Sequence, residues 1–138
     1  LPTFPRELSA HLCQLTLMQI LPGIQEQQLS PVAAGISEIQ RCVGDHFAFA
    51  QGGRFTSPAV ADAITWLEAQ GVAGTGQSSW GPTGFALLPD AGTANDLLVA
   101  ARQRFGELSP LRFRVAQACN RGSEITCESA MNIVEERG

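Results

Sequence analysis

The sequence contains no lysine, and all nine of its basic residues are arginines. Enzymes that depend on a phosphate-loop lysine, a Schiff-base lysine or a serine–lysine dyad are therefore excluded for these residues. The chain also lacks a basic stripe, since thirteen acidic residues outweigh the nine arginines and give a net charge of −4. We expect neither a nucleic acid nor an anionic membrane surface as a partner.

Closely spaced cysteines and long apolar runs are also missing. No pair of the four cysteines has the C-x-x-C spacing of a zinc or dithiol site, so we expect free thiols in a reducing compartment and no metal site. No apolar run reaches the roughly 18 residues that cross a bilayer, and no signal peptide opens the sequence. These features favour a cytoplasmic protein.

The 138 residues suffice for one domain with a core that needs no disulfides, and 44% hydrophobic content is typical of a globular chain. Apolar residues repeat at helical spacing in four segments, two of which open with a Ser-Pro pair that suits an N-cap and first helical position. Glycines or Pro-Gly follow each segment and are expected to end it. The predicted helices cover residues 5–21, 31–43, 58–70 and 93–105, the last opened by Thr93 and Asp96.

Alternating or continuous apolar residues predict strands at 46–50, 72–73, 83–88 and 111–115. From residue 46 onward the order strand, helix, strand, strand, helix, strand is that of a ferredoxin-like antiparallel sheet with helices on one face. We therefore predict an α+β fold preceded by two helices. It forms one domain over residues 1–122, and residues 123–138 follow as a tail for which a further helix is one interpretation.

The segment most informative about function is GTGQSSWGPTG, residues 74–84. The loop predicted from Gly74 to Pro82 is longer than a structural hairpin connection of about two to five residues. Its backbone N–H groups and hydroxyls suit an anion, its glycines permit close approach of a ligand, and Trp80 suits an aromatic or sugar face. The alternative is a glycine-rich turn whose hydroxyls cap local backbone groups.

Other candidate residues carry weaker signals. Arg54 follows a flexible Gln-Gly-Gly bend and suits a carboxylate or phosphate, although a solvated arginine is the alternative. Asp45 and His46 are a candidate acid–base pair, although neighbours on an extended chain point to opposite faces. His11 has no nearby partner in sequence and is expected to be a helix-surface residue. Ser78 and Ser79 have no identifiable base. No catalytic residue can be assigned.

Residues 76–84 resemble the signature loop of the β-ribofuranosylaminobenzene 5′-phosphate synthases, which belong to the GHMP kinase superfamily and act in methanopterin biosynthesis. Glu38-Ile39-Gln40-Arg41 and Gln51-Gly52-Gly53 add to this resemblance, which covers roughly residues 4–122. In the kinases of the superfamily the loop is nearly all glycine. Its middle here is Gln-Ser-Ser-Trp, which favours the synthases.

The resemblance implies a ferredoxin-like C-terminal domain and a reaction of phosphoribosyl pyrophosphate with 4-aminobenzoate or 4-hydroxybenzoate, releasing pyrophosphate and carbon dioxide with Mg²⁺ as cofactor. It also implies roles for Trp80 against the benzoate and for Arg54 on a carboxylate. The expected phosphate-binding residues are Gly74, Gly76, Gln77, Ser78, Ser79, Gly81 and Thr83.

Superfamily members carry an N-terminal domain with a second phosphate-binding loop, and these residues contain nothing like it. Because the chain opens at Leu1 without Met, we expect a C-terminal fragment, inactive alone, whose partners are its own N-terminal domain, the substrates and, in one interpretation, a second copy. Two alternatives are a small-molecule kinase of the same superfamily and a non-catalytic ferredoxin-like domain that binds a small ligand or dimerises.

Overall fold

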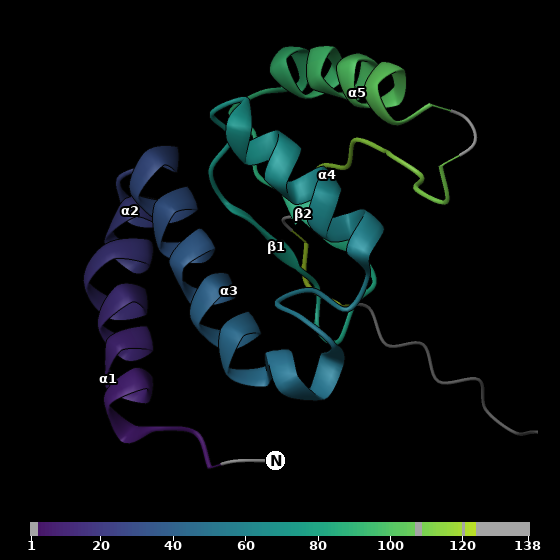
Figure 1. Ribbon diagram of the computed structural model, residues 1–138. Helices are drawn as coiled ribbons and strands as arrows, with labels where there is room; N and C mark the ends of the chain where they lie inside the picture. Colours follow the sequence, from purple (N-terminus) through teal and green to yellow (C-terminus); the bar gives the residue numbers. More distant parts are fainter. Residues whose placement is uncertain (1–2, 107–108, 120, 124–138) are drawn as a thin grey trace, which may run out of the picture.

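The computed structural model describes residues 3–106, 109–119 and 121–123, which form an α+β arrangement (Figure 1). A short antiparallel sheet of two strands is present in this part of the chain, and Thr75 lies opposite Ala86 in it. The elements, in chain order, are α1 (Arg6–Leu15), the π-helical segment η1 (Thr16–Ile20), α2 (Leu21–Gln25), α3 (Leu29–Gln51), α4 (Pro58–Ala69), β1 (Thr75–Gln77), β2 (Gly84–Ala86) and α5 (Ala91–Phe105).

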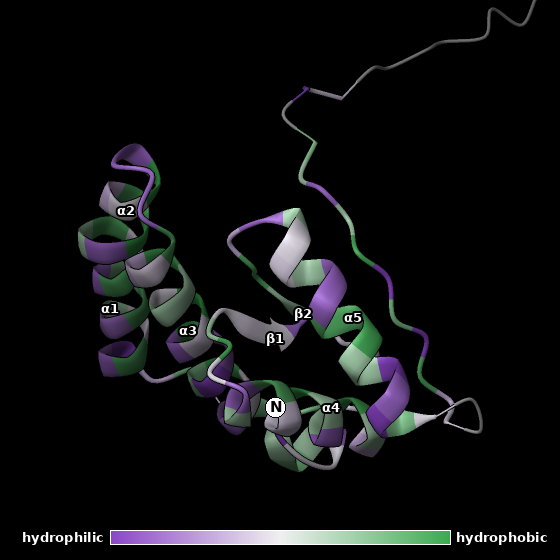
Figure 2. Ribbon diagram, turned by 90° about the horizontal axis from the view of Figure 1, so that it is seen from above, coloured by the Kyte–Doolittle hydropathy of each residue, from purple (hydrophilic) through white to green (hydrophobic). Residues whose placement is uncertain are grey.

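Helix α3 is the centre of this arrangement. The run α1–η1–α2 packs along one side of α3, and β1 packs along the other, with α4 against both strands (Figure 1). Hydrophobic and hydrophilic residues both recur along α1 and α3, as expected for helices that pack with one face (Figure 2). The buried apolar residues come from η1, α3, α4 and α5: Ile20, Ala33, Val60, Ala63, Ile64, Ala94 and Ala101.

The third predicted helix is confirmed, and the fourth is confirmed with an earlier start. Ser57 caps α4 by accepting a hydrogen bond from the N–H of Val60, and Pro58 occupies the first turn. Helix α5 ends at Gly106 as expected, but its N-cap is Asp90 rather than Thr93. Helix α3 likewise begins earlier than predicted, at Leu29 after the cap residue Gln28.

The prediction that Pro22-Gly23 ends the first helix is wrong. The chain stays helical to Gln25, because η1 widens the turn before Pro22 and the proline then falls in the first turn of α2. Gly23 is needed for packing: a Cβ there would lie 2.9 Å from Cγ2 of Val32. Glycine thus permits the close contact between α2 and α3.

The predicted strand at 46–50 is also wrong, since α3 continues through Gly44 to Gln51. One glycine costs only about 1 kcal/mol in a helix, which tertiary contacts readily offset. At Gly44 the contact is close, because a Cβ would lie 2.7 Å from both Cγ and the carbonyl oxygen of Arg54. The helix ends instead at Gly52, whose φ of 84° is the left-handed conformation of a C-cap.

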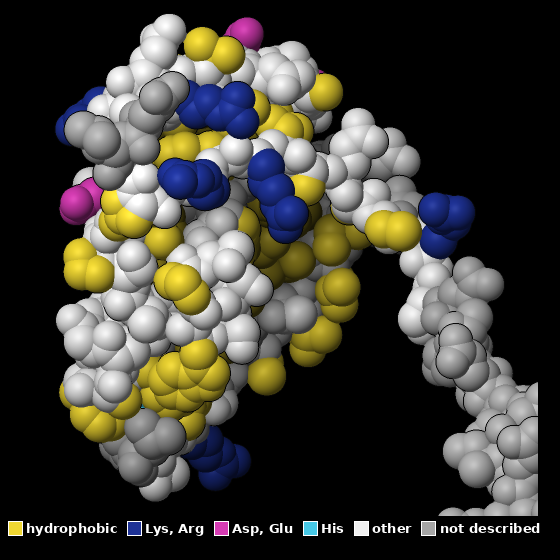
Figure 3. All heavy atoms as spheres, turned by 90° about the vertical axis from the view of Figure 1, so that its right-hand side faces the viewer, with side chains coloured by type: hydrophobic (Ala, Val, Ile, Leu, Met, Phe, Trp, Pro, Cys, Tyr) yellow, Lys and Arg dark blue, Asp and Glu magenta, His cyan; other side chains and the backbone are white. Residues whose placement is uncertain are grey.

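Two further strand predictions fail. Residues 72–73 form no strand, and β1 starts at Thr75, inside the predicted loop, so only residues 78–83 connect β1 to β2. Residues 111–115 form no strand in the described part of the chain. Phe113 packs on Phe105, which packs on Trp66. Figure 3 shows the right-hand side of the molecule in Figure 1, where arginines gather among apolar side chains.

In the described part of the chain the sheet has two strands, and of these only β2 lies within a predicted strand, at 83–88. The predicted tail lies outside the described residues apart from Ser123. Among the helices that the structure describes, none has both the length and the apolar character needed to cross a membrane.

The cap of α5 gives a testable pH dependence. Oδ1 of Asp90 accepts the N–H of Thr93 at 2.8 Å and Oδ2 accepts its hydroxyl at 2.9 Å, and these bonds, the backbone one foremost, lower the pKa of Asp90 below its ordinary 3.8. Asparagine caps helices about as well but carries no charge. We therefore expect the protein to be more stable than Asp90→Asn at neutral pH.

The direction of this pH dependence follows from the linkage between proton binding and folding. Because the folded pKa is lowered, the extra stability is fully present above pH 3.8 and is lost as pH falls through the lowered value. Thermal unfolding of both proteins from neutral pH to about pH 2 should show the two melting temperatures converging. A difference that is the same in acid as at neutral pH would contradict the assignment.

Candidate functional site

The loop between β1 and β2 is closed by its own backbone. Ser78 donates its N–H to the carbonyl of Thr83 at 2.8 Å, and Gly81 donates its N–H to the carbonyl of Ser78 at 2.9 Å. Ser79 and Gly81 have φ values of 52° and 72°, so the chain turns through two left-handed residues. This tight path leaves the side chains of Ser78, Ser79 and Trp80 exposed.

Two polar side chains of α3 hold the backbone that leads into this loop. The hydroxyl oxygen of Ser37 accepts the N–H groups of Gly74 at 2.9 Å and Thr75 at 3.2 Å. Oε1 of Gln40 accepts the N–H of Gln77 at 2.9 Å. Strand β1 is therefore bonded on one side to β2 and on the other to α3.

Ser37 was not singled out from the sequence, and Gln40 was named only as part of the family resemblance. The signal that could have found them is a second stripe of small and polar residues, which recur at helical spacing on one face. Its members are Ala33, Ser37, Gln40 and Gly44.

Gln77 holds the loop from inside. Its Oε1 accepts the N–H of Thr56 at 2.7 Å, and its Nε2 donates to the carbonyl of Ser79 at 3.2 Å. The side chain of Thr56 in turn donates to the carbonyl of Trp80 at 2.7 Å. Gln77 is only 7% exposed. It thus ties the segment after α3 to the loop.

A cavity of about 330 Å³ lies between α3, the segment after it and the loop. This is the small end of the size range of ligand pockets. The rings of Phe47 and Trp80, 5.6 Å apart between centroids, line one part of it, and Trp80 is 56% exposed. The remaining lining residues are polar or belong to α3: Gln40, Val43, Gly44, Gln51, Arg54, Gln77 and Ser79.

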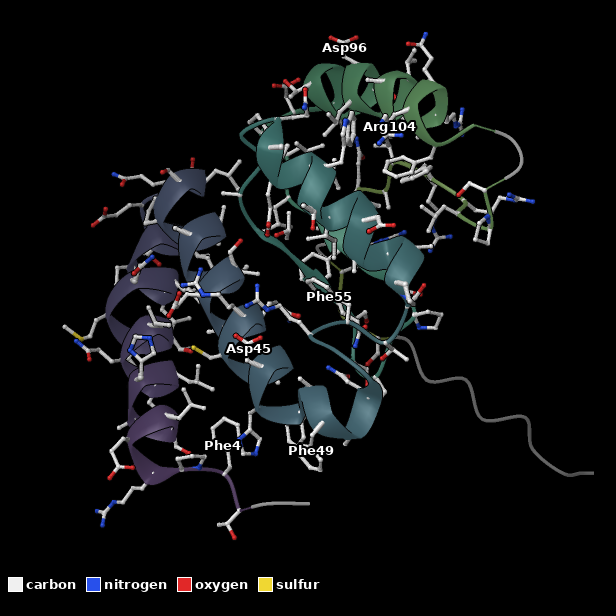
Figure 4. All side chains as sticks on the ribbon, viewed as in Figure 1. Phe4, Asp45, Phe49, Phe55, Asp96 and Arg104 are labelled. Carbon is white, nitrogen blue, oxygen red and sulfur yellow. The ribbon has the colours of Figure 1, made fainter. Side chains whose placement is uncertain are left out.

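Arg54 lines this cavity, but its guanidinium is already paired. Nε and Nη2 donate to the two carboxylate oxygens of Asp45 at 2.7 and 2.9 Å, and the hydrogen bond with Asp45 raises the pKa of Arg54. Figure 4 shows Asp45 on α3. A substrate carboxylate at Arg54 would therefore have to displace a bidentate partner from the same chain.

The residues predicted to bind phosphate fall into two groups. Gly74, Gly76 and Gln77 are buried against α3, whereas Ser78, Ser79, Trp80 and Thr83 are exposed and Gly81 is half-buried. At Gly76 a Cβ would collide with the side chain of Gln40. The space beside this glycine is therefore filled by α3 and not open to a ligand.

The weaker histidine candidates also have defined surroundings. His46 lies on α3 between the rings of Phe4 and Phe47, at 4.5 and 4.7 Å, so it does not pair with Asp45 as acid and base. His11 is exposed on α1, as expected for a helix-surface residue, but it has a partner that is distant in the sequence. Its Nε2 lies 3.2 Å from Oε1 of Glu38 on α3.

The implied Mg²⁺ finds no carboxylate ligand in the loop. Residues 74–84 contain neither aspartate nor glutamate, and Mg²⁺ prefers carboxylate and phosphate oxygens. Asp45, beside the cavity residue Arg54, has both oxygens bonded to that arginine, and Glu68 accepts the hydroxyl of Thr75 at 2.7 Å. The residues of the loop therefore do not fit a metal site of their own, and we assign no step to Mg²⁺.

Fold and site together define an α+β domain that presents a polar loop beside a small, partly aromatic cavity. The family described as GHMP kinases C terminal matches residues 20–107, from the end of η1 through α5. The chain therefore belongs to the GHMP kinase C-terminal family. No curated protein and no solved structure matches it.

Proposed function

We propose that this domain forms one half of the phosphate-binding site of an enzyme similar to the β-ribofuranosylaminobenzene 5′-phosphate synthases. The observation that carries the proposal is the division of the loop. Its first residues are fixed against α3, and its exposed Ser-Ser-Trp segment stands at the rim of the cavity. A rigid, solvent-facing set of donors is what binding of a phosphate group requires.

The proposed roles follow from what each group can donate. The hydroxyls of Ser78 and Ser79 would hold the departing pyrophosphate, with Gly81 and Thr83 beside them. Trp80 and Phe47 would pack against the benzoate ring and shield it from water. The bond from the anomeric carbon to pyrophosphate breaks, a carbon–carbon bond to the benzoate ring forms, and carbon dioxide leaves with its bonding electrons returned to the ring.

A small-molecule kinase is the second candidate. The family match favours it, since the matching family is that of the GHMP kinases. The middle of the loop favours the synthases, because Gln77, Ser78, Ser79 and Trp80 stand where the kinases have glycine. The two candidates differ in product, since a kinase forms ADP from ATP and a synthase releases pyrophosphate and carbon dioxide.

The deciding experiment uses the full native protein that contains these residues. It is incubated with phosphoribosyl pyrophosphate, Mg²⁺ and either 4-aminobenzoate or 4-hydroxybenzoate, and pyrophosphate and carbon dioxide are measured with and without the benzoate. Benzoate-dependent release of both supports the synthase. ADP formation from ATP with an alcohol or sugar supports the kinase, and neither activity in folded protein favours a ligand-binding domain.

Several finer features remain proposals. These are a ferredoxin-like completion of the sheet, an N-terminal domain as the partner that supplies the second phosphate-binding loop, self-association, and a cytoplasmic location. The domain limits at residues 1–122 also stay a prediction.

A further inference from the structure

On the side of α3 that faces α1, three potential metal ligands converge. Oε1 of Glu38 lies 3.2 Å from Nε2 of His11 and 3.5 Å from Sγ of Cys42, and all three ligand atoms lie within 4.8 Å of one another. We propose that His11, Glu38 and Cys42 form a binding site for Zn²⁺. This site is independent of the loop and of the proposed reaction.

The helical geometry explains why the three groups meet. Glu38 and Cys42 are four residues apart on α3 and therefore lie on one face, while His11 reaches them from α1, which packs on that face. Gln40, two residues from Glu38, lies about 200° around the helix. The proposed zinc site and Gln40, which accepts the N–H of Gln77, thus occupy nearly opposite sides of α3.

The distances suit a tetrahedral ion. Zinc bonds of about 2.0–2.3 Å to nitrogen, oxygen and sulfur place neighbouring ligands roughly 3.3–3.6 Å apart. The two contacts of Glu38, at 3.2 and 3.5 Å, are close to these separations. The ligand atoms of His11 and Cys42 lie within 4.8 Å of each other, and both side chains are at least partly exposed, which leaves them free to adjust to an ion.

The chemistry of the ligands selects zinc rather than Mg²⁺ or Ca²⁺. Imidazole, thiolate and carboxylate together are ligands of a borderline ion, whereas hard ions take oxygen alone. Three protein ligands leave the fourth tetrahedral position for water. Arg41 forms an ion pair with the other oxygen, Oε2, of Glu38 and would orient the carboxylate from outside.

Binding would displace one proton from the Cys42 thiol to solvent and would join α1 to α3. The test uses the full native protein, freed of metal and titrated with Co²⁺, whose thiolate complexes absorb in the near ultraviolet, and then with Zn²⁺ in competition. We expect one thiolate-bound Co²⁺ that Zn²⁺ displaces. We also expect a melting temperature that rises with Zn²⁺.

Variants of the ligands decide whether these residues carry the binding. Cys42→Ser should abolish the thiolate absorption, and His11→Gln or Glu38→Gln should weaken Zn²⁺ binding at least as much as loss of an outer-shell partner, about 10- to 100-fold. Cys13→Ser is the matched control, because Cys13 is an exposed thiol on α1 outside the cluster. It should bind metal normally.

Three results would overturn the proposal. These are no thiolate absorption with Co²⁺ in the unsubstituted protein, the same absorption in Cys42→Ser, or its loss in Cys13→Ser. Circular dichroism of each variant checks that the helices are retained, and His11→Gln changes only an exposed position of α1. Zinc binding with no synthase or kinase activity would support this site while leaving the proposed function without support.

Discussion

Gln77→Leu should lower the free energy of unfolding by about 1–3 kcal/mol, the cost of leaving a buried polar group without its partner. The N–H of Thr56 loses its acceptor at 2.7 Å, and the carbonyl of Ser79 loses its donor. Leucine has nearly the same size, so the change tests the amide rather than the volume. Urea unfolding measures the effect.

Gln103→Leu is the matched control, since Gln103 is an exposed residue of α5. It should change stability by no more than about 0.5 kcal/mol. Gln77→Glu keeps an acceptor for Thr56 but removes the donor to Ser79. If Gln77→Leu unfolds at the same urea concentration as Gln103→Leu, the amide does not hold the loop.

Ser78→Ala should reduce kcat/KM of the proposed synthase reaction by about 10²- to 10³-fold, the usual effect of removing a donor to a developing negative charge. The residue is exposed, and the loop hydrogen bonds at this position use its backbone N–H and carbonyl. Alanine therefore removes the hydroxyl while keeping the loop closed. Steady-state pyrophosphate release in the full native protein measures the loss.

The control is Ser9→Ala, an exposed serine on α1, which should leave both activity and stability unchanged. Thermal unfolding of Ser78→Ala should also match that of the unsubstituted protein within about 0.5 kcal/mol. A Ser78→Ala protein with unchanged substrate affinity and rate would remove the loop from the phosphate-binding site. A folded Ser78→Ala protein that fails to bind phosphoribosyl pyrophosphate would support it.

Local signals predicted those elements that local interactions stabilise. The Ser57-Pro58 cap marked the start of α4, and Gly106 marked the end of α5, because capping depends on residues a few positions apart. The apolar run at 83–88 contains β2, and the α+β class is confirmed. The glycines, hydroxyls, amide and indole of residues 74–84 are evident from the sequence, whereas their role in binding stays a prediction.

Predictions failed where a local pattern had two interpretations. Gly44 suggested the end of a helix, and the alternation at 46–50 suggested a strand. The same residues instead belong to one long helix, α3, which packs against other elements on both sides. Gly44 and Gly23 are small because other segments approach them closely, and a single sequence cannot distinguish this from a helix stop.

The residues alone were sufficient for the class of the fold, the position of two helices and the donor-rich character of the loop. Only the tertiary structure determined which loop residues are buried, that Arg54 pairs with Asp45, and that His11 lies beside Glu38 and Cys42. The physical reason is distance along the chain. The contacts of Ser37 and Gln40 with β1 join residues 37 or 38 positions apart, and that of His11 with Glu38 spans 27, so they exist only once α3 has packed between α1 and the hairpin.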